Sequence, residues 1–188
     1  MKIRKNRSRM DMRLRVHIFS LFVGAIIGVS AALYLQPSGR MEVADKPIFK
    51  GKTAVSVARV VDGDTVILLL EGKEHRVRLL GVDTPESVKP DTPPEPGGVE
   101  AGRFLKNLLN GEKVYVEYEA AGKASKDRYG RDLAYLYRAP DGLFVNQEIV
   151  RQGYGRVYRQ AKFKYRDEFI RLEATAKAGQ KGMWAEGG

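Results

Sequence analysis

Two short acidic motifs and two arginines are the residues of this sequence best suited to chemistry. The motifs are residues 62–65 (Asp-Gly-Asp-Thr) and residues 83–86 (Asp-Thr-Pro-Glu); Arg78 lies between them, and Arg131 follows later. Carboxylate oxygens are hard metal ligands, and a guanidinium group can hold a phosphate with two parallel hydrogen bonds. This combination is typical of a site for metal-assisted phosphoryl transfer.

The first motif has two compatible interpretations. Asp-Gly between apolar segments is a strong signal for a hairpin turn, in which Asp62 is a turn residue. In the functional interpretation, the carboxylate of Asp64 binds a metal from the start of the next strand. Both can hold, because a tight turn can place a ligand on a rigid strand end.

The second motif is more specific. Pro85 disfavours helical geometry at Thr84, so the segment can expose the Asp83 carboxylate, the Thr84 carbonyl and the Glu86 carboxylate. The alternative is a helix N-cap followed by Pro at N1. Residues 87–98 contain four prolines and two glycines, which favours a stiff surface loop and weakens the N-cap alternative.

The arginines are ambiguous when each is taken alone. Arg76 and Arg78 lie two positions apart in a strand-like segment and so share one face. We interpret Arg76 as a solvated cation, whereas Arg78 lies five residues before Asp83. Arg131, in the run Asp-Arg-Tyr-Gly-Arg, would by itself be a surface-loop cation.

The amino-acid composition excludes some kinds of site but does not by itself indicate a function. The 188 residues contain no cysteine, which excludes disulfides and thiolate metal sites. The formal charge is +10, but residues 1–15 hold seven Lys/Arg and one Asp, and residues 16–35 hold no charged residue. Only +4 is left for residues 36–188, so the net charge is modest support for a polyanionic substrate.

The N-terminal region predicts export. Residues 16–35 form an apolar stretch of 20 residues, and a helix of that length spans about 30 Å, the thickness of the bilayer core. The basic residues 1–15 before it predict that the chain after it is exported. An uncleaved membrane anchor, a cleaved signal peptide ending near residue 32 and a buried core helix are the three alternatives.

The rest of the chain predicts a mainly β fold with added helices. Residues 36–52 are expected to be a linker, and residues 53–186 a single domain. Strands are expected at 53–61, 65–70, 75–80, 114–118 and 133–137, and helices at 100–109, 145–151 and 165–178. Five strands with a helix before the last two indicate a five-stranded β-barrel of the OB type with about three helices.

Four blocks of sequence, in order, resemble the staphylococcal (micrococcal) nuclease family. They are residues 60–66, 77–86, 127–137 and 145–153, and the similarity covers about residues 53–186, including Trp184 near the end. The resemblance implies an OB-fold nuclease that uses Ca²⁺ to hydrolyse phosphodiester bonds in DNA and RNA.

The resemblance also implies residue roles. Asp64, Asp83 and the backbone carbonyl of Thr84 match the family's calcium ligands. Glu86 matches the proposed general base, which positions the attacking water. Arg78 and Arg131 match the two arginines that hold the scissile phosphate.

Some substrate contacts depart from the family pattern. Lys89 is the one lysine in the proline-rich loop after Glu86. In the family, a tyrosine stacks near the substrate. In this sequence Arg159 takes the matching position, and Tyr158 lies one position away from it. Tyr129 keeps its matched position, and with Arg128 and Tyr158 it is an expected substrate contact.

We therefore expect a monomeric, Ca²⁺-dependent nuclease that is tethered to the membrane or secreted and that leaves 3′-phosphate ends. One alternative is an OB-fold module that binds nucleic acid without catalysis, since a fold does not imply a function. Another is a membrane-anchored scaffold whose basic N-terminal residues bind anionic lipids.

Overall fold

The computed structural model describes residues 49–120 and 124–185. The basic segment 1–15, the apolar segment 16–35 and most of the linker 36–52 lie outside these residues, so their expected roles stay predictions. Within the described ranges, no helix combines the length and apolarity needed to cross a bilayer.

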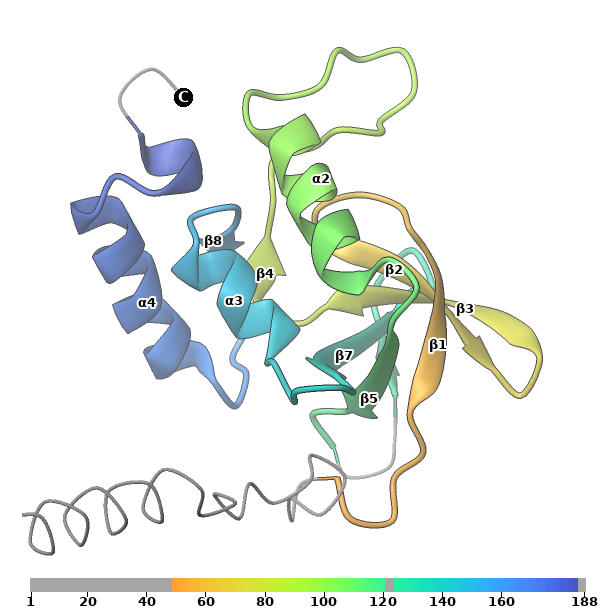
Figure 1. The fold of residues 1–188 in the computed structure, drawn as a ribbon. Coiled ribbons are helices and arrows are strands. Elements are labelled where there is room, and N and C mark those ends of the chain that lie inside the picture. The colour runs from red at the N-terminus through yellow and green to blue at the C-terminus, as the bar shows by residue number, and fades with distance from the viewer. Residues whose placement is uncertain (1–48, 121–123, 186–188) are drawn as a thin grey trace, which may run out of the picture. The chain divides into compact units, whose positions relative to one another are not determined.

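Five strands close into a barrel, as expected. Strand β1 pairs with β2 and β5, β2 pairs with β3, and β5 pairs with β7, all antiparallel. Parallel pairing of β3 with β7 closes the ring (Figure 1). The strands are β1 Val55–Val60, β2 Thr65–Leu70, β3 Lys73–Leu79, β5 Lys113–Glu117 and β7 Asp132–Arg138.

The described residues form three helices, of which α2 and α3 lie against the barrel and α4 packs on α3, and a 3₁₀ turn follows them. They are α2 Gly98–Leu109, α3 Val145–Arg151, α4 Arg166–Ala178 and η2 Gly182–Trp184. Each helix agrees with its predicted range to within two residues. The N-cap alternative for the second acidic motif is wrong, because residues 84–89 have no regular structure and α2 begins only at Gly98.

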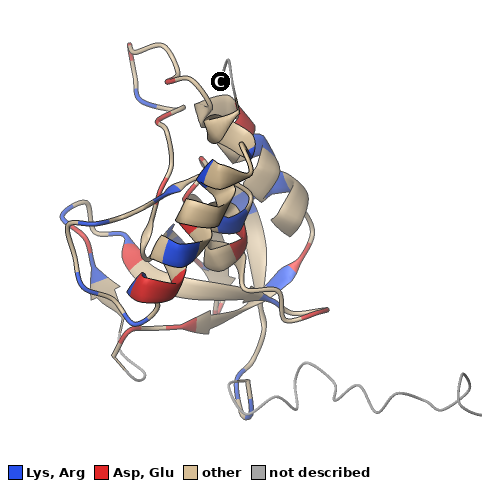
Figure 2. Ribbon diagram, turned by 90° about the vertical axis from the view of Figure 1, so that its left-hand side faces the viewer, with Lys and Arg blue, Asp and Glu red and all other residues tan. Residues whose placement is uncertain are grey.

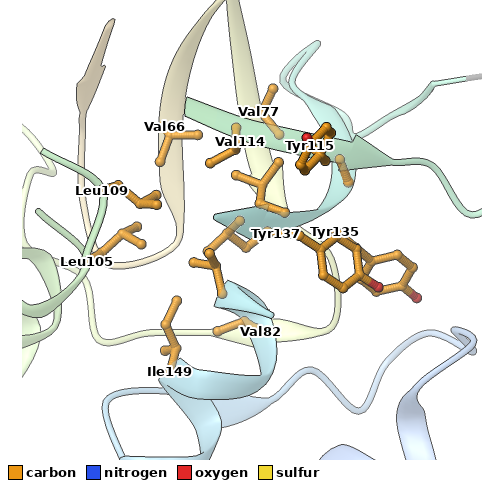
Figure 3. Packing of buried hydrophobic residues seen from close by; sticks show 14 of the residues in the cluster. Val66, Val77, Val82, Leu105, Leu109, Val114, Tyr115, Tyr135, Tyr137 and Ile149 are labelled. Carbon is orange, nitrogen blue, oxygen red and sulfur yellow. The ribbon is translucent and has the colours of Figure 1, made fainter. Parts of the chain in front are cut away.

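The core joins the barrel to α2 and α3 (Figure 3). Val66 and Val77 are opposite each other on β2 and β3 and are fully buried. Leu105 and Leu109 from α2 and Ile149 from α3 pack with them in one hydrophobic cluster. Since strand residues alternate between faces, burial of Val77 turns Arg76 and Arg78 to the other face of β3.

Three two-residue strands were not predicted, because a segment of two residues has no periodicity that a sequence pattern can show. They are β4 Val82–Asp83, β6 Ser125–Lys126 and β8 Arg156–Val157. Strand β4 pairs with β8, so that Asp83 lies opposite Arg156. The second acidic motif thus begins on a paired strand outside the barrel.

Charged residues of both signs are spread over the helices and the barrel (Figure 2). Many of them form ion pairs, such as Arg138 with Asp141 at 2.6 Å and Arg151 with Glu148 at 2.7 Å. The distribution of charge therefore identifies a functional site only locally, where cations or carboxylates converge.

Candidate active site

The first acidic motif is a turn that leads into β2. The N–H of Val61 donates to the carbonyl of Thr65 at 2.9 Å, and the N–H of Asp64 donates to Asp62 Oδ1 at 3.0 Å. Asp62 therefore stabilises the turn, as its Asp-Gly sequence predicts. Asp64 is buried at the start of β2, with 5% of its surface exposed.

The second acidic motif is packed directly against this turn. A Cβ atom at Gly63 would lie 2.7 Å from Thr84 Oγ1 and 2.8 Å from the Cβ of Ala101 on α2. Only glycine lets the two motifs and α2 approach so closely. A Cβ at Gly98 would likewise lie 2.7 Å from the Glu86 carbonyl oxygen, so the first turn of α2 supports the end of the second motif.

Arg78 bridges the two motifs. Its Nη2 lies 3.0 Å from Asp64 Oδ2 and 3.0 Å from Asp83 Oδ1. One guanidinium nitrogen thus contacts a carboxylate from each motif, which places these two carboxylates side by side.

Arg131 reaches the same place from the loop before β7. Its Nε donates to Asp127 Oδ2 at 2.7 Å, and its Nη1 donates to Thr65 Oγ1 at 3.1 Å. The Thr65 hydroxyl in turn donates to Asp64 Oδ1 at 2.9 Å. Arg131 is therefore held in one orientation and connected to the buried carboxylate through Thr65.

Glu86 is at the exposed side of this group. Its Oε1 accepts hydrogen bonds from the N–H groups of Ser87 and Val88, both at 2.9 Å. Its own N–H donates to Glu95 Oε2 at 3.1 Å, and the N–H of Glu95 donates to the Glu86 carbonyl at 2.8 Å. These bonds close the 86–95 loop and orient the Glu86 carboxylate.

Burial has a strong effect on Asp64. It raises the pKa of Asp64 to about 7, although the neighbouring Arg78 and the Thr65 hydroxyl act in the opposite direction. Removal of a carboxylate from water disfavours its charged form unless enough positive charge is nearby. The site would therefore be stabilised by additional positive charge beside Asp64.

The residues around these side chains line two adjoining cavities of opposite charge. The inner cavity has a volume of about 230 Å³ and is lined by five acidic and two basic residues: Asp62, Asp64, Asp83, Glu86, Glu95, Arg78 and Arg131, with Thr84 and Pro85. This excess of carboxylates favours a cation.

The outer cavity has a volume of about 470 Å³ and reverses this balance. It is lined by five basic and two acidic residues: Arg76, Arg78, Lys89, Arg128, Arg131, Asp62 and Glu86, with Val88, Pro90 and Tyr129. This excess of cations favours an anion. Arg78, Arg131, Glu86 and Asp62 line both cavities, so these four residues are at the border between the two charge environments.

The donor chemistry fits a hard divalent cation. Asp64, Asp83 and Thr84 all line the inner cavity and provide oxygen atoms, which Ca²⁺ prefers. Within the described residues, however, no group of three or more His, Cys, Asp or Glu side chains is arranged as a metal site. The reason is visible in the contacts, since Asp64 and Asp83 both point to Arg78 and Glu86 is bound to backbone N–H groups.

The expected substrate contacts lie around the outer cavity. Tyr129 is 68% exposed, and its ring centroid lies 4.8 Å from Arg128 Cζ and 5.4 Å from Arg131 Cζ. Arg78 Cζ lies 5.9 Å from the centroid of Tyr158. The structure therefore brings all three expected contacts next to the arginine pair, although Tyr158 is not in the lining of either cavity.

Two residues of the site were missed from the sequence. Asp127 orients Arg131, and its position four residues earlier in a glycine-containing turn could have suggested this. Glu95 is in the proline-rich segment, where no periodicity indicates which side chains turn inward. Arg159, which takes the matched place of the family tyrosine, pairs with Glu173 on α4.

Comparison with known proteins gives one family. Residues 76–186 match the family described as staphylococcal nuclease homologue. The chain is 36% identical over 166 residues to a thermonuclease of Staphylococcus hyicus, which covers 88% of this chain and 95% of that protein. It is 40% identical over 150 residues to a thermonuclease of Staphylococcus intermedius, which covers 74% of this chain and 84% of that protein.

A relative from another genus gives a similar result. The endonuclease YncB of Bacillus subtilis (strain 168) is 36% identical over 136 residues, which is 71% of this chain and 63% of that protein.

Proposed function

Because the chain belongs to the staphylococcal nuclease family and is a nuclease, we propose that it hydrolyses phosphodiester bonds of DNA and RNA in a Ca²⁺-dependent reaction. The observation that carries this proposal is the change of charge between the two cavities, with Arg78 and Arg131 at their border. A phosphodiester at this border has a cation-binding cavity on one side and a polyanion-binding cavity on the other.

The two arginines hold the scissile phosphate. Arg131 is already oriented by Asp127 and the Thr65 hydroxyl, so it loses little freedom when it binds. Arg78 exchanges part of its contact with Asp64 and Asp83 for the phosphate oxygens. Preorganised guanidinium groups stabilise the charge that develops on the equatorial oxygens in the transition state.

Glu86 positions the attacking water. Two backbone N–H groups hold its Oε1, and among the described residues its Oε2 has no hydrogen-bond partner. The carboxylate is therefore fixed in direction while one oxygen is left for water. A carboxylate that is oriented in this way can bind the water and accept its proton as the water attacks phosphorus. The bond from phosphorus to the 5′ oxygen breaks in the same step, and this leaving oxygen takes up a proton from solvent, so that the phosphate stays on the 3′ oxygen.

Calcium is the cation that the inner cavity would hold. Asp64, Asp83 and the Thr84 carbonyl are the oxygen ligands that we propose for it. When bound, Ca²⁺ supplies positive charge that neutralises a phosphate oxygen and the buried Asp64 carboxylate. Only two of the proposed ligands are carboxylates, which implies a modest affinity for Ca²⁺, suited to the millimolar calcium found outside cells.

The remaining features follow from the family resemblance. The products would have 3′-phosphate ends, and Arg128, Tyr129 and Tyr158 would contact the substrate next to the scissile bond. We also propose that residues 16–35 export the domain and either anchor it in the membrane or are cleaved, and that the chain acts as a monomer.

The test is an assay of the full chain on plasmid DNA, single-stranded DNA and RNA, with Ca²⁺ or with a chelator. Cleavage of all three substrates is expected with Ca²⁺ only, and Glu86→Gln and Arg131→Ala are expected to abolish it. Glu71→Gln and Arg171→Ala, which alter exposed residues away from both cavities, are the matched controls.

The outcomes separate the alternatives. Cleavage that is unchanged in chelator would contradict the calcium mechanism, and full activity of Glu86→Gln would contradict the site assignment. Binding of nucleic acid without cleavage in Ca²⁺ would instead indicate an OB-fold binding module.

A further inference from the structure

Two cations of the outer cavity, Arg76 and Lys89, have no part in the reaction described above. Arg76 lies on β3 two residues before Arg78, and Lys89 lies in the 86–95 loop. Both line the outer cavity together with Arg78.

The spacing along β3 matches that of a nucleic-acid strand. Alternate residues project from the same face of a strand and lie about 6.6 Å apart. Arg76 therefore follows Arg78 along the wall of the outer cavity at a distance comparable to that between successive phosphates of an extended single strand. A strand with one phosphate at Arg78 can thus present its next phosphate to Arg76.

The charges of these two residues are available for a ligand. In residues 49–120 and 124–185, neither Arg76 nor Lys89 has an Asp or Glu oxygen within the 4.0 Å of an ion pair. Arg59 on the neighbouring strand β1 is a useful contrast, since it is paired with Glu74 at 2.8 Å. The exposed cations of the outer cavity are therefore not neutralised by the protein.

The outer cavity also has an apolar wall, which indicates a nucleic acid and not a small inorganic anion. Val88 and Tyr129 are large apolar side chains with 49% and 68% of their surface exposed, and both line this cavity with Pro90. Bases stack on exposed aromatic and apolar side chains in single-strand binding sites, while cations track the backbone. The outer cavity combines both elements.

We propose that Arg76 and Lys89 bind a second phosphate of the nucleic-acid strand, next to the one held by Arg78 and Arg131. The chain would then prefer polynucleotides to dinucleotides, because only a longer strand has a phosphate at this position. This inference rests on the proposed function and adds a second subsite to it.

The experiment compares two substrates that differ in the number of phosphates. Full-length chain, Arg76→Ala, Lys89→Ala and the double variant are assayed in Ca²⁺ on a single-stranded octanucleotide and on a dinucleoside monophosphate. Each single variant is expected to lower kcat/KM for the octanucleotide by about tenfold, the usual effect of losing one charged hydrogen-bonding group. Their kcat/KM for the dinucleoside monophosphate is expected to stay unchanged.

A salt titration provides a second measure. The logarithm of octanucleotide affinity falls linearly with the logarithm of salt concentration, with a slope of about −0.7 per phosphate contact on single strands. Arg76→Ala should make this slope shallower by about 0.7. Arg76→Lys keeps the charge and should keep the slope, and Arg171→Ala on α4 serves as the control for loss of an exposed arginine.

The outcomes distinguish this inference from the proposed function. Equal losses on both substrates would show that Arg76 supports the fold or the chemistry, and no loss on either would show a solvated cation; both results overturn the second phosphate site. A chain that cleaves neither substrate would contradict the proposed function alone. In that case the affinity for the octanucleotide is measured in place of its cleavage. An affinity and a salt slope that Arg76→Ala leaves unchanged would overturn the second phosphate site.

Discussion

Arg78 and Asp64 form an ion pair with a distance of 3.0 Å between Nη2 and Oδ2, and their side chains are only 23% and 7% exposed. The arginine on β3 and the carboxylate at the start of β2 are thereby joined. Since Asp83 contacts the same nitrogen, Arg78 has a structural role between two carboxylates as well as its proposed role at the phosphate.

The first prediction concerns this double role. Arg78→Ala should lower kcat by about 10²–10³-fold, because a preorganised donor to the transition state is lost. Arg78→Lys should restore folding stability in part but little of the rate, since an ammonium group cannot reproduce the planar fork of a guanidinium. Kinetics and thermal unfolding of both variants test this, and a Lys variant with normal kcat would contradict it.

A second prediction is that Glu95 positions Glu86. Its Oε2 accepts the N–H of Glu86 at 3.1 Å. Glu95→Ala should lower kcat by about tenfold with KM little changed, as expected when a catalytic group loses its orientation. Glu95→Gln keeps an acceptor oxygen and should retain most of the activity.

This rescue separates positioning from charge. If Glu95→Gln were as impaired as Glu95→Ala, the negative charge of Glu95 in the inner cavity would be the important property, and the hydrogen bond to Glu86 would not.

A third prediction compares two glycines that lie near each other. Gly63→Ala places a Cβ 2.7 Å from Thr84 Oγ1 and should destabilise the chain by about 1–3 kcal/mol through overpacking. Gly102→Ala, inside α2, meets nothing closer than 3.9 Å and should stabilise it by about 0.5–1 kcal/mol. Denaturant unfolding measures both, and equal effects would mean that the contact at Gly63 relaxes without cost.

A fourth prediction links acid stability to the second motif. Buried Glu173 on α4 accepts the N–H of Val157 on β8 at 3.0 Å and contacts Arg159 and Lys177, and β8 in turn pairs with the strand that carries Asp83. Burial acts to raise the pKa of Glu173, but the hydrogen bond from Val157 and the charges of Lys177 and Arg159 outweigh it, so its pKa is lowered.

The sign of the pH dependence follows from this lowered pKa. The contribution of Glu173 to stability is complete above the ordinary range of a glutamate and is lost as the pH falls through the lowered value in the folded chain. Glu173→Gln should therefore cost about 1–3 kcal/mol at neutral pH, and the difference should vanish in acid. Asp167→Asn on the same helix, whose side chain is 86% exposed, should show no such dependence.

Much of the site could be predicted because its residues occur in short motifs. The Asp-Gly turn before β2, the extended geometry that Pro85 imposes on Thr84 and the alternation that separates Arg78 from Val77 are all local properties of the backbone. The five barrel strands and three helices were predicted for the same reason, since each is long enough to show a period. The alternation along β3 also led to the interpretation of Arg76 as a solvated cation. Its position in the lining of the outer cavity favours a binding role instead.

Other features depend on contacts between distant segments. Glu95 reaches Glu86 only through the closed loop, and Thr65 connects Asp64 to Arg131 across 66 residues of sequence. The two-residue strands β4 and β8 exist only as a pair, because neither segment has a preference of its own that could reveal it.

The sequence by itself determined which groups are present, namely a set of oxygen donors, a glutamate and two arginines, and it determined the barrel that carries them. Only the tertiary structure decided how charge is divided between the two cavities, with Arg78 and Arg131 at the border. The physical reason is that electrostatic fields depend on distances in space, and residues far apart in the chain, such as Arg76 and Arg128, add to one field only once the barrel has closed.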